Sequence, residues 1–199
     1  MAYGTNAPNG LRPVKKLDGS AWTGQTRNYP IASGYATSLF KGDPVTVLAD
    51  GTLGIGVAGS AIVGVFWGVQ WIPSTGGLPQ NSPFWPASTA TQNSAVALAY
   101  VIDDPTVLFT IQETNGAGAA GTPIALTDVG LNANFAVGTG STATGNSGAS
   151  LDNTTENTTN TLNLKIIEAD PYPGNAVGAF ANWIVQINNH RYAAGVAGV

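Results

Sequence analysis

Short runs in which apolar and polar residues alternate recur along this chain, and they constrain its fold more than any other feature. In residues 106–113, Val107, Phe109 and Ile111 fall at every second position, and residues 180–188 repeat the pattern. Successive side chains of a strand point to opposite faces, so this alternation indicates half-buried strands. No window carries a sustained 3.6-residue period. The sequence therefore predicts an all-β fold, either a β-sandwich or a barrel.

Other runs of β-branched and aromatic residues are bounded by turn residues, and each predicts a further strand. These runs are residues 29–31, 44–49, 53–57, 61–72, 95–103 and 162–168. The dipeptide Asp50-Gly51 between two of them is typical of a tight hairpin turn. Only residues 124–132 indicate a helix, and this stretch is short, with Gly121 before it and Gly130 near its end, so we expect few helices.

Composition along the chain divides it into four segments. Residues 1–27 are irregular and rich in Pro and Gly, and we expect an extended N-terminal arm that orders by lying along a neighbouring surface. Residues 28–138 form a β-rich core domain. Residues 139–161 are a Gly/Ser/Thr/Asn-rich tract with few apolar side chains, which predicts a solvent-exposed loop. Residues 162–199 supply C-terminal strands that either complete the core or form a small second lobe.

Charge is scarce in this chain. Charged residues make up 9% of the sequence, where about a quarter is usual, and the formal net charge is −4. Because soluble monomers usually stay dispersed through surface charge, this scarcity indicates that another protein surface covers part of the molecule. We therefore expect a homo-oligomer or a component of an assembly. A monomer with a neutral polar surface is the alternative.

The few charges are unevenly distributed by sign. Up to position 41 the chain has one anion and five cations, and beyond it two cations face ten anions. The five cations are Arg12, Lys15, Lys16, Arg27 and Lys41. They are too dispersed for a nucleic-acid-binding tail, so we expect no direct contact with nucleic acid. An arm that lies on an acidic protein surface fits this pattern, and a loose terminus with ordinary charges is the alternative.

Catalytic and metal-binding constellations are hard to find in the sequence. The absence of cysteine excludes disulfides, thiolate metal sites and cysteine nucleophiles, and His190 is the sole histidine. Asp103 and Asp104 are adjacent, so in a strand they point to opposite faces and do not converge on one substrate. A calcium site needs more oxygens, which Glu168 or Asp170 would have to supply through the fold. We predict no catalytic residues and no metal site.

Residues Gly54 to Gly59 match the glycine fingerprint of dinucleotide-binding proteins. That chemistry requires a helix that begins at the glycines, whereas residues 60–69 are β-branched, aromatic and interrupted by Gly. It also requires an acidic residue about twenty positions later, and residues 51–102 contain none. We therefore interpret these glycines as bends and close backbone approaches within a sheet, and we expect no cofactor.

The five tryptophans allow two interpretations. They are Trp22, Trp67, Trp71, Trp85 and Trp183. Flat aromatic faces stack on sugars, and Trp67 and Trp71 are spaced so that they can share one face of a strand. Tryptophans more often anchor cores or interfaces. We therefore assign Trp67, Trp71 and Trp85 as interface aromatics and keep carbohydrate binding as an alternative.

Membrane insertion is not indicated. The first residues do not form a signal peptide, and the longest apolar run, residues 55–72, is interrupted by glycines and polar residues. We expect a protein that is made in the cytoplasm and does not contact a membrane.

Several segments resemble virion structural proteins of tailed bacteriophages. They are residues 7–14 (APNGLRPV), 29–35 (YPIASGY) and 41–45 (KGDPV), with Gly51 and residues 64–66 (GVF) further along. Within that group, an arm followed by KGDPV and a glycine-marked return strand is similar to head decoration (cement) proteins. The resemblance covers roughly residues 7–115 and concerns the general order and composition of these segments, with no invariant motif.

This resemblance implies a β-tulip-like barrel or sandwich with an extended arm and no enzymatic activity. It also implies a protein that is assembled in the host cytoplasm and binds the outer surface of the phage head. The partner would be the major capsid protein, and a homotrimer is favoured over a dimer. Many symmetric copies that bridge capsomers would stabilise the shell through avidity.

Under this resemblance, we expect the arm residues Arg12, Lys15, Lys16, Trp22 and Arg27 to lie on the capsid or on an adjacent subunit. Two other functions remain open. One is a carbohydrate-binding β-sandwich module. The other is a different virion structural protein, including the shell protein itself, although shell proteins usually carry a long helix that this sequence does not predict.

Overall fold

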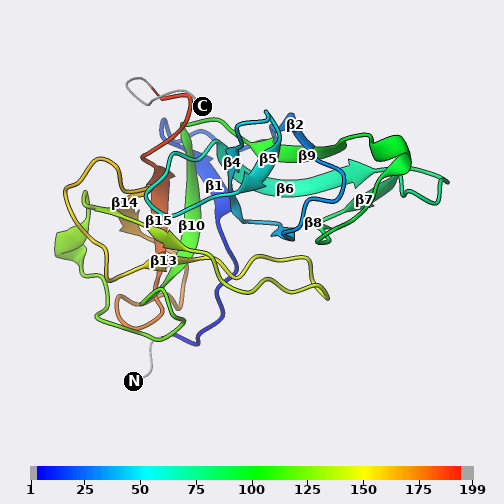
Figure 1. Ribbon diagram of the computed structural model, residues 1–199. Coiled ribbons are helices and arrows are strands. Elements are labelled where there is room, and N and C mark those ends of the chain that lie inside the picture. The colour runs from blue at the N-terminus through cyan, green and yellow to red at the C-terminus, as the bar shows by residue number, and fades with distance from the viewer. Residues whose placement is uncertain (1–3, 194–199) are drawn as a thin grey trace.

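The computed structural model describes residues 4–193 and shows an all-β protein (Figure 1). A nearly closed, barrel-like mixed sheet forms one part, called the body, and antiparallel sheets form a second part, called the lobe. In Figure 1 the lobe projects to the right of the body. The all-β fold predicted from alternation is confirmed.

The body is a seven-stranded sheet in the order β11-β14-β15-β10-β13-β12, with β1 also paired to β10. Its strands are β1 (Arg12–Lys16), β10 (Val107–Thr114), β11 (Asn132–Ala133), β12 (Phe135–Ala136), β13 (Ser150–Asp152), β14 (Leu164–Ala169) and β15 (Asn182–Ile187). Only the β10–β13 pairing is parallel. The segment predicted to supply C-terminal strands thus contributes β14 and β15, which extend the sheet from β10.

The lobe contains a six-stranded sheet in the order β2-β9-β6-β4-β5, with β7 also paired to β6, and a small sheet of β3 and β8. Its strands are β2 (Arg27–Ile31), β3 (Leu39–Phe40), β4 (Pro44–Val47), β5 (Leu53–Ile55), β6 (Gly64–Trp71), β7 (Gln80–Ser82), β8 (Phe84–Trp85) and β9 (Ala97–Ile102). The predicted hairpin joins β4 to β5, and Gly51 adopts the positive φ that this turn requires.

Each part has its own hydrophobic core, and β6 contributes to both. Phe109 and Trp183 are fully buried in the body core, whereas Trp85 is fully buried in the lobe core. Neighbouring residues on β6 point in opposite directions, so Val65 packs into the body core and Phe66 into the lobe core. The strand therefore fixes the lobe to the body.

Residues 7–14 and 41–45 meet at the boundary between body and lobe. The backbone N–H of Leu11 donates to the carbonyl of Gly42 at 2.9 Å, and the N–H of Gly10 donates to Ala149 at 3.1 Å. Gly10 has φ +68, and a Cβ there would lie 2.6 Å from the Gly42 oxygen. Only glycine allows this approach. We call this contact the Gly10–Gly42 junction.

Asp43 holds the same region together from a buried position. Its carboxylate accepts hydrogen bonds from the hydroxyl of Ser147 and from the backbone N–H of Phe40, the latter at 2.7 Å. Burial raises the pKa of Asp43 to about 6. The aspartate of the KGDPV segment therefore ties the start of β4 to the Gly/Ser/Thr/Asn-rich tract.

The N-terminal segment orders along its own chain. Residues 12–16 form β1, which pairs antiparallel with β10, and Leu11 is fully buried in the body core. The chain then reverses, with the N–H of Lys16 donating to the Ser20 carbonyl at 2.8 Å. The expected surface for this arm is therefore the body of the same molecule. Residues 1–3 lie outside the described residues.

The Gly/Ser/Thr/Asn-rich tract differs from the exposed loop that its composition predicts. Residues 147–151 are buried, β13 lies within the tract, and Leu151 belongs to the body core. Gly148 makes this possible, because a Cβ there would lie 2.3 Å from the carbonyl oxygen of Thr139. The small residues allow backbones to pack where side chains would not fit. Other parts of the tract are exposed as its composition predicts, chiefly residues 141–144 and 157–161.

The predicted helix at residues 124–132 is reduced to a single 3₁₀ turn, η2 (Leu126–Asp128). The segment between the flanking glycines is too short to offset the cost of helix nucleation. A second 3₁₀ turn, η1 (Gln92–Ser94), precedes β9. Across residues 4–193, no helix has the length and apolar character needed to cross a membrane.

Candidate functional site

Three of the five cations in the N-terminal region form ion pairs with acids of the same chain. The pairs join Lys15 Nζ to Glu168 Oε1 at 2.7 Å, Lys16 Nζ to Asp104 Oδ2 at 3.0 Å, and Arg27 Nη1 to Asp103 Oδ2 at 3.0 Å. The acidic surface that the sequence predicts for the arm is thus largely the molecule's own body. Partly exposed pairs such as Lys15–Glu168 contribute at most about 1 kcal/mol each.

The most buried of the paired carboxylates is Asp103, at the end of β9. Its Oδ2 also accepts a hydrogen bond from the hydroxyl of Tyr29 at 2.7 Å, and that hydroxyl lies 3.1 Å from the Tyr192 hydroxyl. The negative charge of Asp103 raises the pKa of Arg27. Arg27 is therefore engaged in a local network at the base of the lobe.

Lys41 lies beside two tryptophans, and Arg12, the remaining cation, is near enough for its charge to act on Lys41. The Nζ of Lys41 lies 3.8 Å from the centroid of the Trp67 ring, and Trp22 packs edge-on against Trp67 at 5.3 Å. Partial burial and the positive charge of Arg12 lower the pKa of Lys41. We call Arg12, Trp22, Lys41 and Trp67 the cation–aromatic cluster.

Local structure holds Arg12 in this cluster. Its Nε donates to the backbone carbonyl of Asn9 at 2.9 Å, and its Nη2 donates to the Asn9 side-chain oxygen. Burial lowers the pKa of Arg12. Asp170 shares a hollow of about 160 Å³ with Arg12 but accepts a hydrogen bond from Thr110 at 2.6 Å.

Within residues 4–193, no carboxylate forms a salt bridge with Arg12 or Lys41. The charge of Arg12 acts unfavourably on Lys41, while the Trp67 ring favours the ammonium of Lys41 and the Asn9 oxygens accept hydrogen bonds from Arg12. An incoming carboxylate or other anion would remove this repulsion. The cluster is thus the candidate contact for an acidic group on a partner.

The tryptophans of this chain are all buried or half-buried. Trp71 and Trp85 pack edge to face in the lobe core with ring centroids 5.7 Å apart. The β6–β9 register shifts at Trp67, so Trp67 packs against the body core while Trp71 packs in the lobe core. The two residues therefore do not present one shared aromatic face. Trp85, with no exposed surface, acts as a core residue in this structure.

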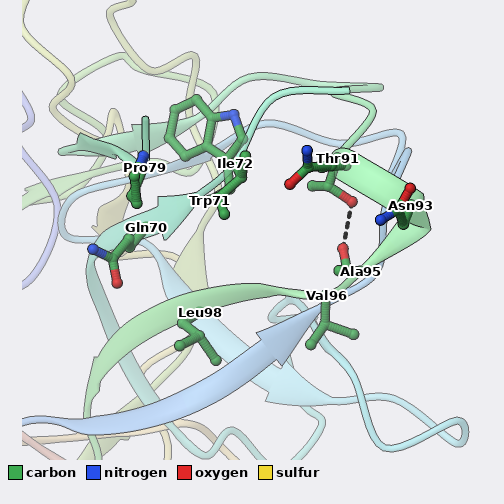
Figure 2. Close-up of a pocket in the computed structure, with 10 residues that line it drawn as sticks. Gln70, Trp71, Ile72, Pro79, Thr91, Asn93, Ala95, Val96 and Leu98 are labelled. Carbon is green, nitrogen blue, oxygen red and sulfur yellow. Dashed lines mark hydrogen bonds between the residues drawn. The ribbon is translucent and has the colours of Figure 1, made fainter. Parts of the chain in front are cut away.

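A groove of about 310 Å³ opens at the end of the lobe (Figure 2). The indole of Trp71 lies across from Val96 and Leu98, with Pro79 towards one end and Asn93 towards the other. Val96 and Leu98 are 51% and 41% exposed, so the groove has an accessible aliphatic wall. We call this site the lobe groove.

The loop that frames the lobe groove is held in a tight conformation. The hydroxyl of Thr91 donates to the carbonyl of Ala95, which closes the turn around η1 (Figure 2). Ser88, Asn93 and Ser94 all have φ between 52° and 57°. Non-glycine residues in this region store strain that the surrounding structure must maintain. The rim of the groove is thus a strained, ordered loop.

The sequence does not predict the lobe groove by any motif, but the sizes of the residues in and before β9 are unusual. The buried positions Ala97 and Ala99 are small, whereas Val96, just before the strand, and Leu98 are large, apolar and exposed. A strand with one solvent-exposed face normally shows the opposite distribution. This face of the lobe is therefore unusually apolar for an exposed surface.

The acidic residues considered for catalysis are held by local partners. Glu168 and Asp104 pair with lysines, Asp104 also accepts from Thr106, and Asp170 accepts from Thr110. In the described part of the chain, no group of three or more His, Asp or Glu side chains is placed to hold a metal ion. His190 is fully buried, its Nδ1 accepts from the backbone N–H of Tyr192, and burial lowers its pKa.

The glycine fingerprint lies in β5 and the following turn. A Cβ on Gly54 would lie 2.9 Å from the side chain of Leu48, and one on Gly56 would lie 3.0 Å from the Pro44 carbonyl oxygen. The next regular element is β6. These two glycines are therefore close packing contacts of the β4–β5 hairpin.

The structure thus presents two candidate contact surfaces, the cation–aromatic cluster beside the Gly10–Gly42 junction and the lobe groove. No protein-family model, curated protein or solved structure matches this chain.

Proposed function

We propose that this protein is a non-enzymatic structural protein that decorates the outer surface of a tailed-bacteriophage head by binding the major capsid protein. The observation that carries the proposal is the cation–aromatic cluster, in which neither Arg12 nor Lys41 has a carboxylate partner among the described residues. The resemblance of residues 7–14 and 41–45 to decoration proteins supports it, because these segments build the Gly10–Gly42 junction beside the cluster.

The contact with the shell would be modest for each copy. A carboxylate that approaches Arg12 and Lys41 gains two charge-assisted hydrogen bonds at a partly desolvated site, where electrostatic interactions are stronger than in bulk water. Trp22 and Trp67 provide apolar area next to the charges. Many copies on one shell then add up, and a ligand that binds only the intact shell stabilises it by mass action.

Other partner classes fit these surfaces less well. Nucleic-acid binding draws its affinity from many phosphate contacts, and here three of the five N-terminal cations are neutralised internally. Carbohydrate stacking needs exposed aromatic faces, and every tryptophan is buried or half-buried. The acidic surface of a protein shell is the partner that we favour.

Cosedimentation tests the proposal. Empty shells assembled from the major capsid protein of the same phage would be mixed with purified wild-type protein, with Lys41→Gln and with the matched control Lys165→Gln. Lys165 lies on β14, away from the cluster, and its substitution removes the same charge. We expect wild type and the control to bind alike, and Lys41→Gln to bind about tenfold more weakly with a smaller dependence on salt.

Two results would count against this function. Failure of the wild-type protein to sediment with shells at any concentration would remove the decoration role. Equal binding by Lys41→Gln and Lys165→Gln would assign shell contact to another surface and remove the cluster from the proposal. Thermal melts of each variant verify that the fold is unchanged.

A further inference from the structure

The end of the lobe farthest from the body carries no charge. Residues 28–40 and 51–102 contain no Asp, Glu, Lys, Arg or His, and they supply β3, β5, β6, β7, β8, β9 and all of β2 except Arg27. The low charge of the chain is therefore not spread evenly. It reflects a body with ion pairs and a lobe end that is neutral throughout.

The same lobe end exposes large aliphatic side chains. Leu78, in the loop between β6 and β7, is 86% exposed, and Val96, just before β9, forms the open wall of the lobe groove together with Leu98 on β9. Depletion of charge together with aromatic and aliphatic residues is the composition of a buried interface centre. Exposed apolar side chains gathered around a groove mark an association surface.

We propose that the lobe end is where two copies of this chain associate, with Leu78 of each copy seated in the lobe groove of the other. The absence of charge identifies the occupant, because a charged partner surface would lose its hydration here and gain no opposite charge. The fitting surface is neutral and apolar, and the chain's own lobe end has that chemistry.

The geometry of the patch agrees with a two-fold contact. In such a contact the same surface of both copies must contain the projecting group and the site that receives it. Leu78 directly precedes Pro79, which lines the groove, so projection and receptor lie side by side. A groove of about 310 Å³ that ends on the Trp71 indole has room for a leucine side chain.

Association through sheet edges is less suitable. β2 and β5 are the outer strands of the lobe sheet. In β2, Pro30 has no N–H to donate and Arg27 begins the strand. β5 and β7 have three residues each. Side-chain packing at the groove is thus the mode of contact. This inference does not rest on capsid decoration, since the pairing requires only the chain itself.

Sedimentation velocity over a hundredfold range of concentration tests the pairing with purified protein. We expect the wild type to reach the mass of two copies. Leu78→Asp and Leu98→Asp should each raise the dissociation constant at least tenfold. The matched control Leu126→Asp should leave it unchanged, because Leu126 is 66% exposed on η2 of the body. All three side chains are exposed, so thermal melts should confirm intact folding.

Cross-linking tests the seating of Leu78 directly, because the chain has no cysteine of its own. Leu78→Cys and Val96→Cys would be prepared separately, mixed and oxidised. We expect a disulfide-linked pair in the mixture well above that in either variant alone, and none when Leu126→Cys replaces Val96→Cys.

A wild-type mass of one copy, or of three, would overturn the two-fold contact. So would equal weakening by the body control. These measurements use no shells, so failure of the pairing and failure of the decoration function are separate results.

Discussion

Glu113 gives the fold a dependence on pH that a single substitution should remove. It lies at the end of β10 with no exposed surface, and its Oε2 accepts a hydrogen bond from the backbone N–H of Ile124 at 2.8 Å. Its other oxygen has no hydrogen-bond partner, and neither does the buried side-chain oxygen of Asn153 nearby. Burial raises the pKa of Glu113 to about 7. The protonated acid therefore suits this site better than the carboxylate.

The sign of the effect follows from this raised pKa. Between about pH 4.5, where the unfolded side chain titrates, and about pH 7, the folded protein holds a proton that the unfolded chain has released. The free energy of unfolding therefore falls as the pH rises through this interval, by about 3 kcal/mol from Glu113. A glutamine keeps the acceptor for Ile124, stays neutral and offers an N–H towards Asn153. Glu113→Gln should thus be more stable than wild type above pH 7.

Urea unfolding of wild type and Glu113→Gln at several pH values measures this difference. Comparing the two proteins cancels other groups, such as Asp43, whose pKa is raised to about 6, and His190, whose pKa is lowered. We expect nearly equal stability below pH 4.5 and a growing advantage of the variant up to pH 7 and beyond. A difference that does not change with pH, or a variant less stable above pH 7, would refute the reasoning.

Two further substitutions test how the N-terminal segment is held. Gly10→Ala should lower the free energy of unfolding by more than about 2 kcal/mol, because φ is +68 and a Cβ would lie 2.6 Å from the Gly42 oxygen. Gly34→Ala should lower it by only about 1 kcal/mol, because Gly34 has φ +76 but nothing lies within 4 Å of its Cβ position. Similar losses in urea unfolding would show that the junction is not tight. Leu11→Ala should cost about 2–5 kcal/mol, whereas Leu17→Ala, at a 54% exposed position, should change stability by under about 0.5 kcal/mol. A neutral Leu11→Ala would mean that the segment is not part of the body core.

The sequence predicted the strands well because the relevant signal is local. The alternation around Phe109 and around Val185 is the pleat of β10 and β15, and the Asp50-Gly51 dipeptide specifies its own hairpin. The short helical pattern at residues 124–132 misled because propensity without a long apolar face does not offset nucleation.

The candidate surfaces were harder to predict because they depend on contacts between distant residues. Pairing of β1 with β10 sets Lys16 opposite Val107 and so brings it next to Asp104, which no local pattern reveals. The bulge at Trp67 reverses the direction of that side chain relative to Trp71. Composition also predicted an exposed tract at residues 139–161, but small residues can pack backbone against backbone, as Gly148 does.

The scarcity of charge acquires a physical meaning once the charges are located. In the body, Lys15, Lys16 and Arg27 are neutralised by acids from other strands, which leaves Arg12 and Lys41 as a distinct basic spot. At the lobe end, residues 28–40 and 51–102 carry no charge, and the groove lies among them. Salt screens a charged surface but not an apolar one. Under our two proposals, the fold separates a polar contact for an acidic partner from an apolar contact for a second copy of the chain.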